Sequence, residues 1–413
     1  MDLLRFATAG SVDDGKSTLI GRLLLDSKSI FEDQFEEVDK ISRSRGYDYT
    51  DLALLTDGLR SEREQGITID VAYRYFSTPR RNFIIADTPG HIQYTRNMVT
   101  GASTADLGLV LVDARRGLTE QSQRHTVLLA LLRVPSIVLC VNKMDLVGYS
   151  QEIFEQIRDD FTNLTARLGA PAAECVPISA LNGDNVVEQS ANMPWYEGHP
   201  LLHRLEHASG VSGRTLGDTR FPIQYVIRPK SREYPDYRGY AGSLAGGVLK
   251  PGDEVVILPS GFTTTVKEID FFDREVTEAY PPMSVTIRLA DDVDISRGDM
   301  ITRISDQPTV TQDVEAMVCW MSTTPLLARQ KLSIKHTTRH ARAHVKDIDY
   351  RLDIATLHQD LEATSLSLND IGRIQLRVTH PLMIDRYEKN RTTGSFILID
   401  EATGMTAGAG MIL

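Results

Sequence analysis

The fold of the amino-terminal half of this sequence is decided by the stretch Gly10-Ser-Val-Asp-Asp-Gly15-Lys16-Ser17. This stretch fits G-x-x-x-x-G-K-[ST] and lies between an apolar segment, which predicts a strand, and an amphipathic segment, which predicts a helix. In that context loop N–H groups surround phosphate oxygens, the lysine reaches the terminal phosphates and the hydroxyl faces Mg²⁺. A glycine-rich turn without a ligand is the alternative, and the joint presence of strand, helix, lysine and serine disfavours it. The phosphate-binding residues are expected to be Gly10, Ser11, Val12, Asp13, Asp14, Gly15, Lys16, Ser17 and Thr18.

Short apolar runs alternate with longer amphipathic segments through the first 210 residues. This alternation predicts an α/β domain with a mainly parallel, doubly wound sheet covered by helices. The expected strands are 3–9, 67–76, 82–87, 107–112, 136–142 and 174–178, and the expected helices are 16–25, 93–104, 120–132 and 150–168. The stretch 27–64 is charged and poor in apolar periodicity, so we expect a long irregular loop of the kind that is usually functional.

The pattern changes after residue 210, where a polar segment rich in glycine and serine predicts a linker. Short alternating strands with Gly and Pro turns follow, and a second polar break, 305–308, separates them from another such series. We therefore expect three domains: the α/β P-loop domain at 1–210, an all-β barrel at 211–307 and a second all-β barrel at 308–413.

Composition narrows the class of protein. No window approaches the roughly 18 uninterrupted apolar residues of a membrane-spanning helix, and the first residues lack the features of a signal peptide. We therefore expect a cytoplasmic protein that has no membrane partner. The formal charge of −11 disfavours phosphate backbones, so no nucleic acid partner is expected. The three cysteines stand far apart, which argues against a disulfide framework and a thiolate zinc site.

Three further motifs follow the phosphate loop, each at the carboxyl end of an expected strand. The D-T-P-G-H motif offers a carboxylate to Mg²⁺ and a glycine amide to a terminal phosphate. The N-K-M-D motif ends in a carboxylate that can accept two hydrogen bonds from guanine, a pair of donors that adenine lacks; its asparagine can tie the loop to the phosphate loop, and the stem of its lysine can cover the ring face. The S-A-L motif offers amides to guanine O6. Together the motifs predict a site for GTP and Mg²⁺, made by Asp87, Thr88, Pro89, Gly90, His91, Asn142, Lys143, Met144, Asp145, Ser179, Ala180 and Leu181.

In this order the motifs resemble the GTP-binding domain of translational-type GTPases, the elongation factor Tu-like family. The resemblance implies a first switch at 66–70 in which Thr68 binds Mg²⁺ and senses the γ-phosphate, and it implies that His91 orients the attacking water. It also implies the two β-barrels, so it covers the whole chain. The expected catalytic residues are then His91, Thr68 and Lys16, and the expected metal ligands are Ser17, Thr68 and Asp87.

Elongation factor Tu and its relatives usually carry histidines at two phosphate-loop positions where this chain has Ser11 and Asp14. With that departure, the segments 10–23, 57–76 and 91–106 resemble the large GTPase subunits of bacterial ATP sulfurylase. The resemblance implies a heteromeric enzyme in which GTP hydrolysis drives the formation of adenylyl sulfate and pyrophosphate from ATP and sulfate. It also implies fusion to, or association with, an adenylyl-sulfate kinase in some members.

The sequence contains neither an S-G-G-x-D-S nor an H-x-G-H motif, so we expect the ATP and sulfate site on a partner, the small catalytic subunit. Because switch segments lie beside the γ-phosphate, 27–64 and the helix after His91 are expected to touch that partner. Two other functions remain open at this point. One is an elongation factor-type GTPase that delivers aminoacyl-tRNA, and the other is a GTP-sensing scaffold without turnover, which the presence of His91 and Thr68 disfavours.

Two groups of residues suggest further sites. The spacing of His336, His340 and His344 suits a metal on a helix, but the surrounding alternation predicts a strand. Histidines four apart on a strand lie about 13 Å from each other, too far to share a zinc ion. Arg115 and Arg116 follow a strand near the active end of the domain and suggest an arginine finger. We interpret them as ordinary loop residues, because no motif places them on the phosphates.

Overall fold

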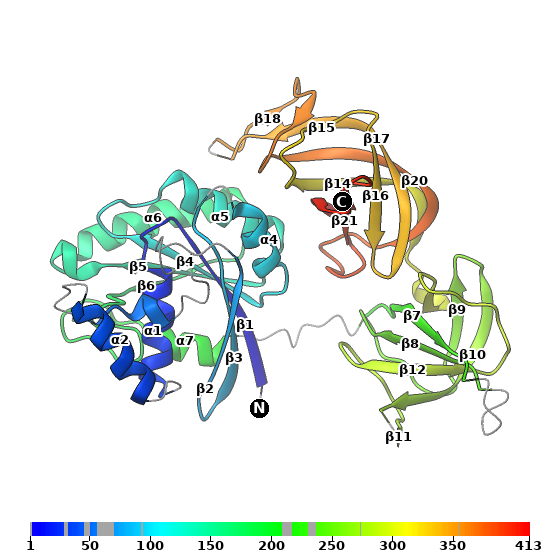
Figure 1. Cartoon of the computed structure of the whole chain (residues 1–413), viewed down its shortest axis with the longest axis horizontal. Helices are drawn as coiled ribbons and strands as arrows, with labels where there is room; N and C mark the ends of the chain where they lie inside the picture. Colours follow the sequence, from blue (N-terminus) through cyan, green and yellow to red (C-terminus); the bar gives the residue numbers. More distant parts are fainter. Residues whose placement is uncertain are drawn as a thin grey trace. The chain divides into compact units, whose positions relative to one another are not determined.

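The structure of the chain is a computed structural model that describes residues 2–28, 32–44, 50–55, 70–91, 94–208, 217–229, 237–272, 274–354 and 356–413, without the side chains of 32–35 and 37. The chain forms two compact units, Met1–Ser212 and Gly213–Leu413 (Figure 1). The first unit contains the α/β fold and the second contains only β-structure and short turns.

A six-stranded sheet forms the centre of the first unit, in the order β2-β3-β1-β4-β5-β6. Its strands are β1 (Asp2–Gly10), β2 (Ala72–Ser77), β3 (Arg81–Asp87), β4 (Leu107–Asp113), β5 (Ser136–Asn142) and β6 (Glu174–Pro177). β2 runs antiparallel to β3, and the other neighbouring pairs are parallel. Every residue of β4 is buried, as expected for a central strand covered on both faces. The predicted doubly wound α/β fold is confirmed.

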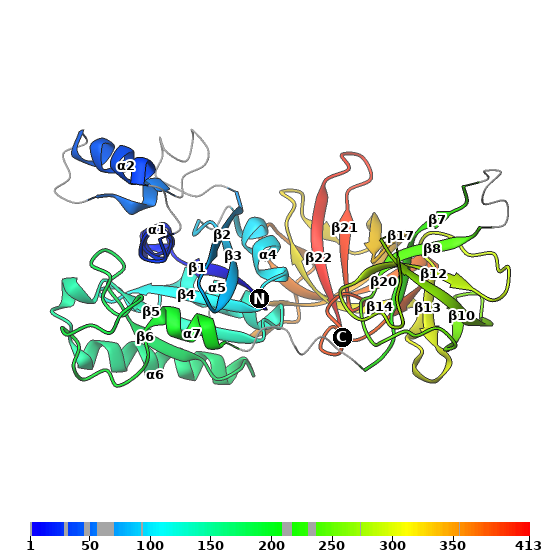
Figure 2. The same cartoon turned by 90° about the horizontal axis from the view of Figure 1, so that it is seen from below.

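Helices cover both faces of this sheet, with α1 on one side and α6 on the other (Figure 2). The helical segments are α1 (Lys16–Asp26), α2 (Glu32–Ser44), α4 (Thr95–Ser103), α5 (Glu120–Leu131), α6 (Gln151–Arg167) and α7 (Leu201–His207), with 3₁₀ turns η1 (Leu52–Leu55) and η3 (Met144–Val147). Side-chain caps fix two of the helix starts: Thr119 accepts from Ser122 N before α5, and Ser150 accepts from Ile153 N before α6. Among the described helices, none is long and apolar enough to cross a membrane.

The expectation that 27–64 is irregular is wrong for its described part, which contains α2 and η1. Helix α2 is rich in charge, but Phe35, Val38 and Ile41 recur at three-residue spacing, and Val38 is buried. Its charges also pair at i,i+4: Lys40 Nζ lies 3.9 Å from Glu36 and Arg43 Nε lies 2.8 Å from Asp39. Such pairs add modestly to the stability of a helix. Turn η1 packs closely on α1, because a Cβ at Gly21 would lie 2.3 Å from the carbonyl oxygen of Leu52.

Two predicted boundaries change. The strand expected at 67–76 begins at Ala72, and 67–69 lie outside the described residues. Before it, the Asp70 carboxylate accepts from the backbone N–H of Val71 at 2.8 Å, a local bond that competes with strand pairing. The helix expected at 93–104 is described from Thr95 to Ser103, and residue 93 is outside the described range.

The amino-terminal part of the second unit is a closed barrel. Its sheet runs in the order β11-β10-β12-β8-β7-β13-β9, and a further pairing of β10 with β9 closes the ring. The side chains of Phe221, Tyr240, Val255 and Ile287 lie in its core. The strands are β7 (Phe221–Ile227), β8 (Gly239–Ser243), β9 (Glu254–Leu258), β10 (Phe262–Phe271), β11 (Arg274–Glu275), β12 (Ser284–Leu289) and β13 (Met300–Arg303).

The carboxyl-terminal part is a second closed barrel, in the order β16-β21-β22-β14-β20-β17-β18, closed by a pairing of β16 with β17. Trp320, Ile374 and Leu376 lie in its core. The strands are β14 (Thr309–Trp320), β16 (Lys331–His336), β17 (Arg339–Leu352), β18 (Gln359–Asp360), β20 (Ile371–Ile384), β21 (Ser395–Ile399) and β22 (Thr406–Ile412), with a separate pair β15 (Leu326–Leu327) and β19 (Ser365–Leu366). Both predicted barrels are confirmed, and their boundaries with the first domain stay a prediction.

The three spaced histidines fall on two strands, β16 and β17, rather than on one. His336 is fully buried and its Nε2 lies 2.7 Å from the carbonyl oxygen of Thr393. Within the part of the chain that the structure describes, no group of three His, Cys, Asp or Glu side chains is arranged to hold a metal ion. The strand interpretation of this segment therefore holds, with a turn between two strands.

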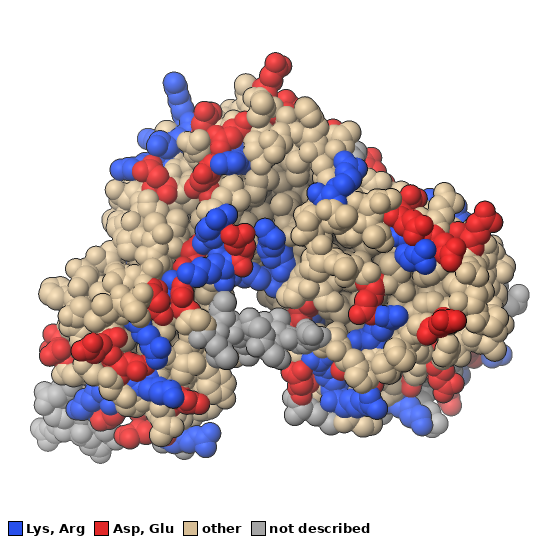
Figure 3. Space-filling view, turned by 180° about the vertical axis from the view of Figure 1, so that it is seen from behind, with Lys and Arg blue, Asp and Glu red and all other residues tan. Residues whose placement is uncertain are grey.

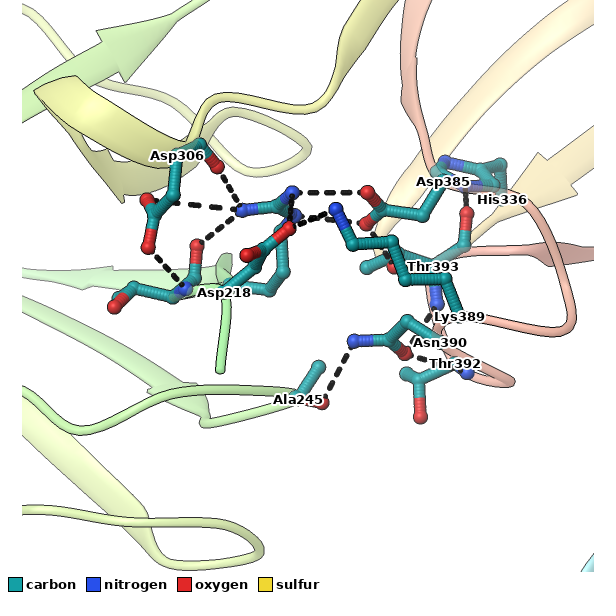
Figure 4. Close-up of polar contacts among 11 residues, drawn as sticks. Asp218, Ala245, Asp306, His336, Asp385, Lys389, Asn390, Thr392 and Thr393 are labelled. Atoms are coloured by element: carbon teal, nitrogen blue, oxygen red, sulfur yellow. Dashed lines mark hydrogen bonds and ion pairs between the residues drawn. The ribbon is translucent and has the colours of Figure 1, made fainter. Parts of the chain in front are cut away.

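A buried polar network joins the two barrels of the second unit (Figure 4). Arg220 is fully buried, and its Nε and Nη2 donate to the two carboxylate oxygens of Asp385 at 2.7 and 2.9 Å. Thr393 Oγ1 donates to the same carboxylate at 2.6 Å, and Asn390 Nδ2 donates to Ala245 O at 3.0 Å. Burial raises the pKa of Asp385, but the hydrogen bonds from Arg220 and Thr393 outweigh it and lower the pKa. These contacts explain why the two barrels form one compact unit.

Candidate functional site

A cleft of about 590 Å³ opens at the carboxyl ends of the strands of the first sheet. This is the edge at which doubly wound sheets bind ligands. The cleft is lined by Val12, Asp13, Gly15, Lys16, Ser17, Thr18, Asp51, Ala53, Gly90, His91, Arg115, Asn142, Lys143, Asp145, Leu146, Ser179, Ala180 and Leu181. Residues of all four sequence motifs therefore meet in one place.

Other predicted site residues lie behind the cleft wall or outside the described chain. Gly10, Ser11, Asp14, Asp87, Thr88, Pro89 and Met144 do not line the cleft. All of them are buried. Thr68 and the rest of 66–69 lie outside the described residues.

Asn142 connects the phosphate loop to the S-A-L loop. Its Nδ2 donates to the carbonyl oxygen of Asp14 at 2.8 Å, and its Oδ1 accepts from the backbone N–H of Ala180 at 2.9 Å. Gly15 has a φ of 90°, and a Cβ there would lie 2.4 Å from Asn142 Nδ2. The glycine is therefore required both for the left-handed backbone and for this contact. The bond to Asp14 is the tie between the N-K-M-D loop and the phosphate loop that the sequence predicts, and the bond from Ala180 was not predicted.

Lys16 lies at the floor of the cradle formed by the phosphate loop. Its side chain is buried, and Nζ donates to Ser11 O at 2.7 Å and to Gly10 O at 3.2 Å. A Cβ at Gly90 would lie 2.9 Å from the backbone C and O of Ser11 and 2.4 Å from Lys16 Nζ, so only glycine lets the D-T-P-G-H loop come this close. Burial lowers the pKa of Lys16, and the carboxylate of Asp87 opposes that shift.

The residues expected to hold Mg²⁺ fit the ion by their chemistry. Ser17 offers a hydroxyl in the cleft, and the buried Asp87 carboxylate accepts from Thr8 Oγ1 at 3.0 Å. Hydroxyl and carboxylate oxygens are the ligands that Mg²⁺ prefers, directly or through water.

Nδ1 of His91 is buried and has no hydrogen-bond partner among the described residues. The ring of His91 packs edge-on against Tyr94 with 6.1 Å between centroids.

Lys143 and Asp145 form the opposite end of the cleft. Lys143 has a left-handed backbone with φ 62°. Its Nζ donates to the carbonyl oxygen of Asp13 and lies 3.1 Å from a carboxylate oxygen of Asp113. Asp145 lies in the first turn of η3 and lines the cleft. The cleft thus has a cationic phosphate-loop end and an acidic end suited to a base with two adjacent donors.

Comparisons with known proteins agree with this geometry. Residues 1–218 match the family described as elongation factor Tu GTP binding domain, and residues 313–413 match the GTP-eEF1A C-terminal domain-like family. Sulfate adenylyltransferase subunit 1 of Alteromonas mediterranea is 50% identical over 414 residues, covering 100% of this chain and 87% of that relative. The chain belongs to the sulfate adenylyltransferase subunit 1 family.

A relative in Mycobacterium tuberculosis, named Bifunctional enzyme CysN/CysC, is 60% identical over 412 residues, which are 100% of this chain and 67% of that protein. Among solved structures, the crystal structure of Sup35 complexed with GMPPNP covers 100% of this chain and 94% of its own, at 23% identity and a TM-score of 0.45. That likeness is too weak to carry an argument. The sequence relatives place this chain in the subunit 1 family over its full length.

The two phosphate-loop residues that depart from the elongation factor Tu pattern now have a structural role. The Asp14 side chain is 1% exposed, and its Oδ2 accepts from the backbone N–H of Ser11 at 2.6 Å. Burial raises the pKa of Asp14. In this member of the family, Asp14 therefore closes the phosphate loop on itself, facing away from the cleft.

Sequence reasoning missed His125, which supports the phosphate loop from helix α5. His125 is fully buried, and its Nδ1 accepts from the backbone N–H of Gly10 at 3.0 Å. Its Nε2 lies 2.8 Å from the side-chain amide of Gln121. Burial lowers the pKa of His125 to about 3, so the imidazole stays neutral and remains an acceptor. No periodicity marks this residue, because its partner lies 115 positions away.

Replacing His125 by phenylalanine is expected to lower the free energy of unfolding by about 1–3 kcal/mol, because the Gly10 N–H is left buried without an acceptor. His125→Asn keeps an acceptor near the Nδ1 position and should recover part of that loss. The pKa of His125 is depressed on folding, so its contribution is full above pH 6.5 and is lost as pH falls towards about 3. Urea unfolding from pH 5 to 8 measures the free energy of unfolding of wild type and of His125→Asn. The difference between the two free energies should be constant above pH 6.5 and should change below it. A difference that stays constant over the whole range would contradict this.

Arg115 lies in the turn after β4, and the interpretation that it is a loop residue without an arginine-finger role stays a prediction. Arg115 lines the cleft, and its Nη2 lies 2.6 Å from the Asp113 carboxylate. The guanidinium group is therefore held beside the N-K-M-D end of the cleft. Arg116 Nη1 lies 3.5 Å from Val12 O. Three other lining residues were not foreseen. Asp51 and Ala53 come from the region around η1, whose structure the sequence did not predict, and Leu146 follows the N-K-M-D motif.

Proposed function

We propose that this chain binds GTP with Mg²⁺ and hydrolyses it, and that hydrolysis drives the synthesis of adenylyl sulfate and pyrophosphate from ATP and sulfate on a partner catalytic subunit. One observation carries the nucleotide assignment: the Lys16 cradle and the Asp145 carboxylate lie in a single cleft, linked through Asn142. Membership of the subunit 1 family supports the assignment of the driven reaction.

In this proposal the amides of 10–18 and Lys16 bind the phosphates, and Asp145 accepts the two guanine donors. The stem of Lys143 covers one face of the base, and the amides of Ala180 and Leu181 meet O6. His91 orients the attacking water, a role that its unpartnered Nδ1 leaves it free to take among the described residues. Preorganised donors of this kind stabilise charge that develops on the phosphates.

Ser17, Asp87 and Thr68 would hold the Mg²⁺ ion. When bound, Mg²⁺ neutralises charge on the phosphate oxygens. The carboxylate of Asp87 is already fixed by the Thr8 hydroxyl, which orients it without help from the ion. Thr68 enters this set through the family resemblance alone.

The partner in this proposal is a small catalytic subunit that carries the ATP and sulfate site, in the cytoplasm. We propose that it docks on the stretch 27–64, of which Asp51 and Ala53 line the cleft, and on α4, the helix that follows His91. Association with an adenylyl-sulfate kinase is proposed on the resemblance to bifunctional relatives. Acidic and basic side chains are interspersed over most of the face drawn in Figure 3.

The experiment that tests the function mixes this chain with the small catalytic subunit, ATP, sulfate and GTP. We expect phosphate release from GTP to accelerate only when the partner and both of its substrates are present, with adenylyl sulfate forming in parallel. Hydrolysis that ignores the partner would contradict the proposal. Salt-dependent, GTP-dependent capture of aminoacyl-tRNA would instead support the elongation-factor alternative.

The guanine assignment has its own prediction. Asp145→Asn is expected to weaken GTP binding about 100-fold, because two hydrogen bonds to a charged acceptor are lost. The same change should strengthen XTP binding by a similar factor, since xanthine has a carbonyl where guanine has its exocyclic amine and the asparagine amide can donate to it. Titration calorimetry measures both constants. Asp159→Asn, on the exposed side of α6, is the matched control, and equal losses for GTP and XTP would disprove base recognition by Asp145.

A further inference from the structure

Asp113 ends strand β4 and belongs to none of the four motifs. Its side chain is 1% exposed and lies between two cations. Carboxylate Oδ2 lies 3.1 Å from Lys143 Nζ and 2.6 Å from Arg115 Nη2. Carboxylate Oδ1 accepts from the Nε and the backbone N–H of Arg115, both at 3.0 Å. A buried carboxylate with this many donors has a fixed position.

The backbone around Asp113 is also tied to the N-K-M-D loop. In the parallel pairing of β4 with β5, Asp113 lies opposite Asn142. The N–H of the next residue, Ala114, donates to Asn142 O at 2.9 Å. The end of β4 is thus hydrogen-bonded to the start of the N-K-M-D loop. Because of this connection, Asp113 on β4 can fix the direction of the Lys143 side chain on the loop.

Lys143 is held at its ammonium end by two partners from different loops. One is the carbonyl oxygen of Asp13 in the phosphate loop, and the other is the Asp113 carboxylate. The left-handed backbone at Lys143 sets where the side chain starts, and these two partners set where it ends. The aliphatic stem between them lies in the wall of the cleft. A lysine without such partners would sample many rotamers.

We propose that Asp113 is a positioning residue for guanine recognition: it holds the ammonium group of Lys143 so that the stem of the lysine is ready to cover the base, and Arg115 holds Asp113. This rests on the proposed binding of GTP in the cleft. Asp113 does not touch the nucleotide in this arrangement, and it acts only through Lys143.

The charge of Asp113 persists over the working pH range. Burial raises its pKa, but the hydrogen bonds from Arg115 and Lys143 outweigh burial and lower the pKa to about 2. The contact with Lys143 is therefore a charged one at every pH at which the chain would act. Asparagine at this position keeps the shape of the side chain and removes the charge.

A double-mutant cycle tests the proposal, with Asp113→Asn, Lys143→Met and the double variant. Asp113→Asn is expected to raise the Kd for GDP and the KM for GTP about 10- to 30-fold, the scale of freeing a lysine side chain. The kcat should stay within about twofold, because Lys16 and His91 are untouched. The double variant should be no weaker than Lys143→Met alone. Additive effects, or a fall in kcat that equals the rise in KM, would overturn the proposal.

Arg115→Met tests the same clamp from its exposed end and avoids changing a buried carboxylate. It should raise the Kd for GDP about 3- to 10-fold, whereas Arg158→Met, a partly exposed arginine of α6, should leave the Kd unchanged. An unchanged Kd for both Asp113→Asn and Arg115→Met would overturn this inference while GTP binding by the wild type stands. If the wild-type chain binds no guanine nucleotide, the proposed function itself fails.

Discussion

Lys16→Ala is expected to lower kcat/KM for GTP hydrolysis by about a thousandfold or more, equivalent to about 4 kcal/mol of transition-state stabilisation. Lys16 is the buried cation at the floor of the phosphate-loop cradle. A charge-assisted hydrogen bond in a site that excludes water is stronger than one at a surface, and alanine offers nothing in its place. Single-turnover GTP hydrolysis, with and without the partner subunit, measures the effect.

Two further variants make this result specific. Lys331→Ala removes an exposed lysine of β16, in the second unit, and should leave kcat/KM unchanged. Lys16→Arg keeps the charge but should restore little activity, because the cradle is tight around Nζ, with Gly90 close beside it. Activity of Lys16→Ala within about tenfold of wild type would show that the cleft is not the hydrolytic site.

Arg220→Met is expected to lower the free energy of unfolding of the second unit by about 3–5 kcal/mol. The substitution leaves the buried Asp385 carboxylate without its bidentate partner, and it also removes donors to Asp306 O and Thr219 O. Breaking one side of a buried pair costs more than the pair contributes, because the remaining charge stays desolvated. Urea unfolding followed by Trp320 fluorescence in a Trp195→Phe background reports on this unit alone.

The pH dependence and two control variants distinguish the contribution of the Arg220–Asp385 ion pair to stability from that of packing in general. The depressed pKa of Asp385 means that the pair stabilises the folded chain above pH 3.8 and that this stabilisation is lost as pH falls below it. Lys250→Met breaks an ion pair whose side chains are about half exposed, and it should cost less than about 1 kcal/mol. Arg220→Met combined with Asp385→Leu should recover part of the loss. A loss below about 1 kcal/mol for Arg220→Met would disprove a central role of this pair.

The α/β fold and the four motif loops were predictable because their signals are local. The glycines and lysine of 10–18 lie within one loop, and apolar runs mark β1, β4 and β5. Helix α2 was not predictable in this way. Its apolar residues Phe35, Val38 and Ile41 have helical spacing, but they are few among many charged residues, so the sequence predicts an irregular loop. Because η1 was not foreseen either, the sequence missed Asp51 and Ala53 at the cleft.

The residues that support the site depended on the tertiary structure. His125 reaches Gly10 only because α5 packs against β1. Arg115 and Lys143 meet at Asp113 only because β4 pairs with β5. Neither arrangement leaves a pattern in the sequence, because partners far apart along the chain meet only through the register of the strands.

The sequence by itself determined the class of this protein: a phosphate loop, a guanine-type N-K-M-D loop and two β-rich segments in an order typical of one GTPase family. Spacing along a strand–loop–helix unit is enough for that, because each motif acts through neighbouring backbone groups. Only the tertiary structure decided which side chains hold those motifs in place and that Arg220 and Asp385, 165 residues apart, join the two barrels. The reason is that buried polar contacts depend on where strand ends meet in space, and many distant residues of the same type are equally plausible partners from sequence alone.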